Sequence, residues 1–304
     1  MDLKDRKSKV DISMFGKISK DVAWSLPNIL MAKDIKEVAK KINEHSYKRR
    51  YTAYTGEFIL LMGGHPIKVG ISPFIIDMIQ KKLFTHVAMN GAAMYHDIEI
   101  ALEGKTSEYV EETIGTDFAE RNEATELIIK ALSDNNIAKV MTLGQLIGAT
   151  IDCEHLQYAN HSILCNCINN EISTTVHQML GTDVYHQHLS SESLEELQKI
   201  SIIDYRTLDV VISILLSTGG VLINLGSAVM FPEIFLKCLS RHHIDKNQSK
   251  NITLVNMDFQ PSYRELNNIV NRPKLLGIET YNLIGCHEIM FPLLHYMIMN
   301  GVYE

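Results

Sequence analysis

The chain has 304 residues and a net charge of −7, with 46% hydrophobic and 21% charged residues, which is typical of a soluble globular protein with a substantial core. It has no apolar run of the roughly 20 residues that cross a bilayer, and its N-terminal stretch is charged, so we expect neither a membrane protein nor a secretory signal. The acidic balance and the lack of interleaved aromatic residues argue against a nucleic-acid partner, and five irregularly spaced cysteines indicate free thiols in a reducing cytoplasm.

Residues 1–52 are predicted to form a helical arm. Apolar residues recur there at helical spacing between charged ones, at Met31, Ile35, Val38 and Ile42. Residues 1–50 hold 13 Lys and Arg against 7 Asp and Glu, so they carry +6 and the other 254 residues carry −13. The basic cluster Lys48–Arg50 is interpreted as a solvated helix face, with contact to an anionic partner as the alternative.

From residue 53 onward, short apolar runs alternate with amphipathic stretches. The runs EFILLM, THVAMNG, GGVLINL and NITLVNMDF are predicted strands. Helices are predicted over 72–83, 94–102, 117–132, 209–215, 230–243 and 287–301, and in the first of these we expect Ser72 as the N-cap and Pro73 at the first helical position. Such a pattern is typical of a parallel sheet covered on both faces. We therefore predict a single α/β domain over 53–304, doubly wound and of Rossmann type.

The predicted strand ends are candidates for a binding site, because ligands of open parallel sheets bind at the carboxyl ends of the strands. The candidate cofactor-binding residues at these ends are Gly63, Gly64, Asn90, Gly91, Ala92, Gly226, Ser227 and Asp258. Small residues let a ligand approach the backbone, and a carboxylate suits ribose hydroxyls. We therefore predict a nucleotide-type ligand in a crevice rimmed by Gly63, Gly91 and Gly226. The sequence has neither a G-x-G-x-x-G fingerprint nor a P-loop.

The stretch NGAAMYHDIEIAL has the outline of a strand end, a small-residue turn and an acidic helix start that is found in the deoxyhypusine synthase family. VLINLGSAVMFPEIFLKCL resembles the family's later strand, glycine turn and helix, and ITLVNMDFQPSYRELNNIVNRPK resembles its acid-bearing strand end followed by Arg-Pro. The resemblance covers roughly residues 55–300. It implies NAD as the cofactor, and a homotetramer, a dimer of dimers, with sites between paired subunits. It also implies a transferase that oxidises spermidine and passes on an aminobutyl group through an enzyme-lysine imine.

The sequence departs from that family where the chemistry lies. The family's Ser-Trp-Gly-Lys is missing, the single tryptophan is Trp24 in the arm, and Lys274 follows its Arg-Pro pair too soon to take the lysine's place. Tyr95 and His96 stand where acids are expected, which leaves Asp97. We therefore predict an NAD-dependent enzyme that oxidises, or transfers part of, a small polyamine-like substrate. The alternatives are a non-catalytic NAD- or nucleotide-binding protein and a degenerate partner subunit of an active paralogue.

The predicted catalytic residues are His96, Asp97 and His287. A histidine near a strand end can accept a proton while an amine carbon loses hydride, and a carboxylate can orient it. Adjacent residues on a helix point apart, so the alternative for either member of the first pair is a helix cap. For His287, the alternative is a structural position just before the last helix without a catalytic role. The presence of Glu288 there is then explained by its favourable interaction with the helix dipole.

The pair His186 and His188 would face one side of a strand and could share a metal with His177 or Asp183. No complete ligand set is visible, so we predict no metal site.

Overall fold

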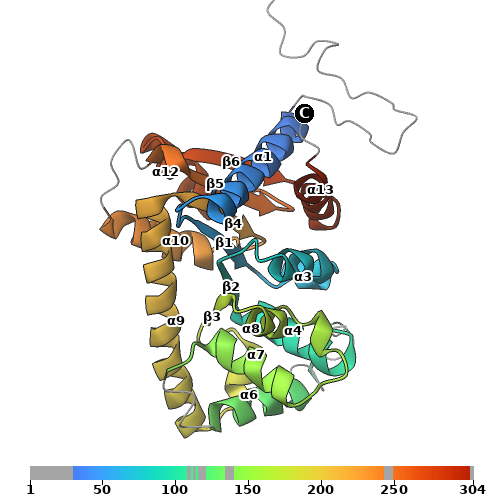
Figure 1. Cartoon of the computed structure of the whole chain (residues 1–304). Helices are drawn as coiled ribbons and strands as arrows, with labels where there is room; N and C mark the ends of the chain where they lie inside the picture. Colours follow the sequence, from blue (N-terminus) through green and yellow to red (C-terminus); the bar gives the residue numbers. More distant parts are fainter. Residues whose placement is uncertain are drawn as a thin grey trace, which may run out of the picture.

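The computed structural model describes residues 30–107, 111, 114–115, 121–133, 140–242 and 249–301. Its centre is a six-stranded sheet in the order β3-β2-β1-β4-β5-β6, with every pair of neighbours parallel (Figure 1). The strands are β1 (Glu57–Met62), β2 (His86–Asn90), β3 (Ser173–His177), β4 (Gly220–Leu225), β5 (Ile252–Asp258) and β6 (Glu279–Ile284). This is the Rossmann strand order, in which the direction of winding reverses between β1 and β4.

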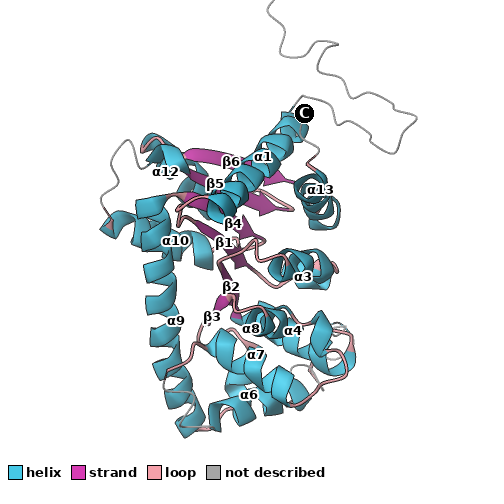
Figure 2. Ribbon diagram, in the orientation of Figure 1, coloured by secondary structure: helices cyan, strands magenta, loops and turns pink. Residues whose placement is uncertain are grey.

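Helices connect the strands and cover the sheet (Figure 2). The α-helices are α1 (Leu30–Tyr51), α2 (His65–Lys68), α3 (Ser72–Gln80), α4 (Gly91–Glu103), α6 (Glu123–Ser133), α7 (Leu143–Cys153), α8 (Ile163–Asn169), α9 (Ser191–Thr218), α10 (Met230–Arg241), α11 (Tyr263–Glu265), α12 (Arg272–Leu275) and α13 (His287–Asn300). Short 3₁₀ turns are η3 (Ala159–His161), η4 (Val184–His188) and η5 (Ser249–Asn251), and η6 (Leu266–Asn271) is π-helical.

The sheet divides the core into two clusters of buried side chains, because successive residues of a strand point to opposite faces. In β1, Phe58, Leu60 and Met62 join the larger cluster, whereas Ile59 and Leu61 join the smaller one. The larger cluster includes side chains of α1, α3, α4, α7, α8 and α13, and the smaller one those of α9 and α10 (Figure 1). Strands buried on both faces explain why they are apolar along their whole length.

The helix α1 packs against the larger cluster. The contacts are made by the apolar side chains that recur at helical spacing in the sequence, among them Ile35, Val38 and Ile42. Lys41 pairs with Glu279 of β6 at 2.8 Å, and Asn43 Nδ2 donates to the carbonyl of Ile298 in α13 at 3.0 Å. Residues 30–51 are therefore attached to the sheet domain. The rest of the predicted arm, residues 1–29, lies outside the described residues, and the domain boundary at residue 52 stays a prediction.

The sequence-based prediction of the fold class is confirmed, and the four predicted strands are β1, β2, β4 and β5. Several details differ from the prediction. Ser72 is not an N-cap: it is the first residue of α3, Ile71 precedes it, and no side chain caps the helix. The helix predicted over 117–132 begins at Glu123, and residues 117–120 lie outside the described part.

Within the described part of the chain, no helix is both long and apolar enough to cross a bilayer. All five cysteines are free thiols, three of them buried. The cytoplasmic location stays a prediction.

Candidate functional site

The turns after the central strands meet at one edge of the sheet. The amide of Gly63 donates to Leu225 O at 3.0 Å, one residue beyond the paired strands β1 and β4. A Cβ on Gly63 would lie 2.0 Å from the carbonyl oxygen of Gly226, and one on Gly64 would lie 3.5 Å from the Cβ of Ala92. These turns therefore lie close together in the structure, as the sequence predicted.

The space beside these glycines is filled by protein atoms. A Cβ on Gly226, whose φ is +63°, would meet His287 at 3.0 Å and Pro66 at 3.1 Å. One on Gly91 would meet the Asp183 carboxylate at 2.1 Å. Gly63, Gly91 and Gly226 thus allow close packing of the chain on itself, and the shared crevice that the sequence suggested between these three residues is filled at these contacts. Their role as cofactor-binding residues stays a prediction.

A cavity of about 270 Å³ lies next to these turns, at the carboxyl end of β2. The first half of α4 forms one wall and the loop after β3 forms another. The lining residues are Lys68, Gly91, Ala92, Tyr95, His96, Glu99, Ser107, Thr182, Asp183, Val184 and Tyr185. The predicted residues Gly91, Ala92 and His96 therefore share one cavity, whereas Asp97 and His287 do not line it.

His96 is held by a carboxylate, as an acid/base group requires, but the carboxylate is Glu99 and not Asp97. Thr106 donates its hydroxyl proton to Glu99, and His96 Nδ1 lies 2.7 Å from the Thr106 oxygen and 3.2 Å from Glu99 Oε2. Because the Thr106 hydroxyl proton points to Glu99, Nδ1 of His96 must be the donor, and in the neutral ring Nε2 then carries a lone pair that accepts no hydrogen bond from a described residue. Burial opposes the charge on Glu99, but the hydrogen bonds of His96 and Thr106 outweigh it and lower the pKa of Glu99.

The other wall of the cavity brings a second carboxylate and the ring of Tyr185, which lies against the ring of Tyr95 on α4. Asp183 accepts the amide of Met179 at 3.2 Å and the hydroxyl of Tyr185 at 3.5 Å, both on Oδ2. Burial raises the pKa of Asp183. The rings of Tyr95 and Tyr185 stack at 6.0 Å. Carboxylates and aromatic faces attract ammonium groups, so this wall suits an amine.

Asp97 points away from the cavity and caps another helix. Its carboxylate accepts the hydroxyl of Ser162 at 2.6 Å and the amides of Ile163 and Leu164 at 2.7 and 3.0 Å, at the start of α8. Burial raises its pKa to about 6 in spite of these bonds. The capping alternative therefore describes Asp97 in this structure, and a catalytic role has no geometric support.

His287 returns to the strand ends from β6, as the sequence suggested. Its Nδ1 lies 2.9 Å from Nδ1 of His65, its Nε2 lies 3.2 Å from Met257 O, and burial lowers its pKa. The ring of Phe259, which follows β5, stacks on His65 at 4.5 Å. These three rings form an aromatic cluster over the ends of β1, β5 and β6, beside the cavity but not in it.

Asp258, the predicted ribose ligand, ends β5 as a nearly buried side chain whose Oδ1 accepts the amide of Phe259 at 2.7 Å. It faces Glu265, which is fully buried, and neither Glu265 oxygen makes a regular hydrogen bond among the described residues. Burial, and after it the Asp258 carboxylate, raise the pKa of Glu265 to about 8. The pair therefore holds a proton near neutral pH. Ser227, also predicted, accepts the Phe231 amide at 3.4 Å.

Replacement of Glu265 by Gln should flatten the pH dependence of stability. Between pH 4.5 and about 8 the native state keeps a proton that the unfolded chain has released, so the free energy of unfolding falls as pH rises. For one such group the slope approaches about 1.4 kcal/mol per pH unit. Urea unfolding at several pH values should show a shallower decline for Glu265→Gln than for wild type. Glu288→Gln, an exposed control, should keep the wild-type slope, and equal slopes in all three proteins would contradict the expectation.

A shared metal at His186 and His188 was expected only if both side chains faced one side of a strand. They lie instead on the 3₁₀ turn η4. Nε2 of His186 lies 3.1 Å from Gln178 Oε1, and its Nδ1 accepts the Gly181 amide at 3.3 Å. No group of three or more potential metal ligands lies within the described ranges.

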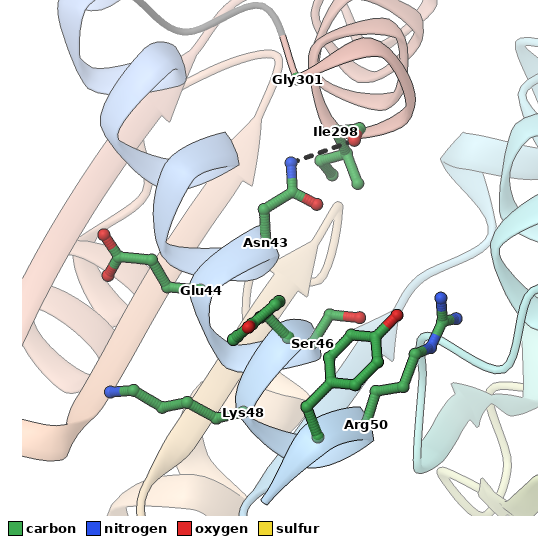
Figure 3. A pocket seen from close by; sticks show the side chains of 9 residues that line it. Asn43, Glu44, Ser46, Lys48, Arg50, Ile298 and Gly301 are labelled. Atoms are coloured by element: carbon green, nitrogen blue, oxygen red, sulfur yellow. Dashed lines mark hydrogen bonds between the residues drawn. The ribbon is translucent and has the colours of Figure 1, made fainter.

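The basic cluster at the end of α1 has two parts. Arg49 donates to the carbonyl of Leu83 at 2.7 Å, so it joins α1 to the sheet domain. Lys48 and Arg50 line an open hollow of about 590 Å³ between α1 and α13, together with Tyr47 and Tyr51 (Figure 3). An anionic partner for these two residues stays an alternative.

Fold and site together define a parallel α/β protein of Rossmann strand order with a small cavity, lined in part by charged groups, at the carboxyl edge of its sheet. No protein-family model and no curated protein matches the sequence. Solved structures do match. An LOR/SDH protein from Methanococcus maripaludis S2 has a TM-score of 0.56 at 17% identity, over 97% of this chain and 74% of that one.

Two further structures are similar. A protein of Entamoeba histolytica assigned as a deoxyhypusine synthase has a TM-score of 0.52 at 14% identity, over 90% of this chain and 89% of its own. AgrE, solved with ornithine and NAD+, has a TM-score of 0.55 at 14% identity over 88% of this chain, which spans 33% of AgrE. At these identities the matches show the fold alone, and they confirm the deoxyhypusine synthase-like fold that the sequence resemblance predicted.

Sequence reasoning missed the residues that complete the cavity. Glu99 lies three positions after His96 on α4, a spacing that places two side chains on one face of a helix. The sequence therefore contained a signal for this pair. Asp183 and Tyr185 come from a distant loop, and Lys68 from a four-residue helix, so no local pattern connects them to His96.

Proposed function

We propose that the chain is an NAD-dependent enzyme of deoxyhypusine synthase-like fold that oxidises a small amine or transfers part of it. The observation that carries the proposal is the cavity in which a histidine with a free Nε2 meets the Asp183 carboxylate and two tyrosine rings. It lies at the carboxyl edge of the parallel sheet, which is where ligands of this fold class bind.

The residues at the strand ends fit part of a dinucleotide. Beside the Asp258 carboxylate, Glu265 offers two buried oxygens that lack donors among the described residues, and ribose hydroxyls are such donors. AgrE, which is similar in fold, was solved with NAD+. At Gly226, however, His287 and Pro66 occupy the space beside the backbone, so a diphosphate there requires these two side chains to shift. When bound, NAD supplies a hydride acceptor.

The chain's own groups would hold the amine and move its proton. Asp183 and the rings of Tyr95 and Tyr185 bind the ammonium form. His96 accepts a proton at Nε2, because Thr106 and Glu99 fix its other nitrogen as the donor. The Glu99 carboxylate then stabilises the imidazolium that forms.

The first test is thermal stability of the whole protein with NAD, NADH and ADP-ribose added singly. A ligand present at 100 times its dissociation constant should stabilise the native state by about 2.7 kcal/mol. No shift with any of the three would remove the cofactor from the proposal. If NAD binds, NADH absorbance should rise on addition of amines, whereas tight NAD binding without turnover would favour the non-catalytic alternative.

His96→Gln should retain NAD binding and lose turnover by a factor of about 100 or more, the usual range for a general base. His161→Gln, an exposed histidine that does not line the cavity, should behave as wild type. Turnover by His96→Gln at the wild-type rate would exclude it as the base.

We further propose that a second copy of the chain covers this edge of the sheet. Large apolar side chains that are 45% to 71% exposed collect after β3, β4, β5 and β6, at Met179, Leu180, Val229, Phe259, Tyr263 and Ile289. Exposed apolar surface of this kind marks protein contacts. In sedimentation, Tyr263→Glu combined with Ile289→Glu should lower the molecular mass, whereas Leu275→Glu, 86% exposed in α12, should not. An unchanged mass in both proteins would count against this interface.

A further inference from the structure

The amine cavity also contains a cation. Lys68, the last residue of α2, lines it together with Glu99 and Asp183. The side chain is exposed, and its ammonium group makes no ion pair with another described residue. An ammonium group on the wall of an amine site repels a second ammonium group, so it affects which substrates can bind.

The two carboxylates of the cavity differ in what they can still bind. Glu99 accepts hydrogen bonds from His96 and Thr106 on Oε2, and its carboxylate also accepts a backbone hydrogen bond from Ser107. Asp183 uses Oδ2 for Met179 and Tyr185, and its Oδ1 has no hydrogen-bond donor within the described ranges. The negative end open to a ligand is therefore Asp183, and the positive end is Lys68.

We propose that the substrate is a small zwitterion, an amino compound that carries a carboxylate as well as its ammonium group. This inference rests on the proposed function and specifies its substrate class. Asp183 binds the ammonium group and Lys68 binds the carboxylate, so a diamine or polyamine meets one wrong charge. The volume, about 270 Å³, lies just below the usual range of roughly 300–1,000 Å³ for drug-sized ligands, which suits a small substrate.

The test compares ligands of equal chain length by calorimetry on the whole protein with NAD present. For chains of three to five carbons, the probes are the α,ω-diamine, the ω-amino acid and the dicarboxylate. The tightest amino acid should bind at least about tenfold more tightly than its matched diamine and dicarboxylate.

Variants separate the two ends of the ligand. Lys68→Gln should weaken the amino acid at least about tenfold and leave the diamine unchanged or tighter, whereas Asp183→Asn should weaken both. Lys82→Gln, an exposed lysine paired with Glu171, should bind all probes as wild type. If the diamine binds as tightly as the amino acid, or if Lys68→Gln does not change the affinity for the amino acid, the substrate is not a zwitterion. Either result would still be consistent with a site that binds amines. No binding of any ammonium compound overturns the proposed function itself.

Discussion

Gly63→Ala is expected to destabilise the protein by about 3 kcal/mol or more, near the upper end of what overpacking costs. The new Cβ would lie 2.0 Å from the carbonyl oxygen of Gly226 and 3.0 Å from its carbon. Both are backbone atoms of a turn that is itself hydrogen-bonded to Met257, so the clash cannot be relieved by a side-chain rotation. Urea unfolding of the purified variant measures the loss directly.

Gly64→Ala is the matched control, one residue further along the same turn. Its Cβ would meet His96 at 3.1 Å and Ala92 at 3.5 Å, and the nearer atom belongs to a side chain. We expect a loss of about 1 kcal/mol or less. Equal losses for the two variants would show that the turn of β4 yields and that the close approach of Gly63 is not a constraint.

Asp97→Ala is expected to cost about 3 kcal/mol or more. The substitution leaves the Ser162 hydroxyl and the amides of Ile163 and Leu164 without their acceptor, in a position that water does not reach. A lost cap costs about 1 kcal/mol by itself, and each buried donor left unpaired adds about as much. The measurement is the free energy of unfolding, with ligand binding recorded on the same samples.

Asp97→Asn separates a structural role from a catalytic one. It retains one acceptor oxygen and nearly the same shape, so it should lose less stability than the alanine variant and keep wild-type turnover below its melting temperature. A fully folded asparagine variant without activity would instead return Asp97 to the catalytic residues.

The central strands could be predicted because their side chains are buried on both faces, which leaves an apolar run in the sequence. β3 and β6 were not recognised, for a reason visible in their composition. β3 reads STTVH, with Thr174 and Thr175 buried as polar partners of neighbouring groups. β6 is an edge strand, half-exposed along most of its length, and reads ETYNLI. Neither pattern is periodic enough to distinguish a strand from a loop.

The candidate site could be predicted only where it depends on local order. His96 is predictable because it follows a strand end, and the geometry of a helix already indicates that Asp97, the adjacent residue, points elsewhere. On α4, Glu99 shares the face of His96, whereas Asp97 points to α8. The position of Asp183 against Gly91 depends on how a distant loop folds back onto the turn of β2, which a single sequence does not encode in any short pattern.

The contact between the turns of β1 and β4 limits how this protein can close around a ligand. The two halves of the sheet are joined at the carboxyl edge by the hydrogen bond from Gly63 to Leu225 and by the touching backbones of Gly63 and Gly226. A hinge at that seam would have to break both. We therefore expect no closing motion between the two halves of the sheet when a molecule binds.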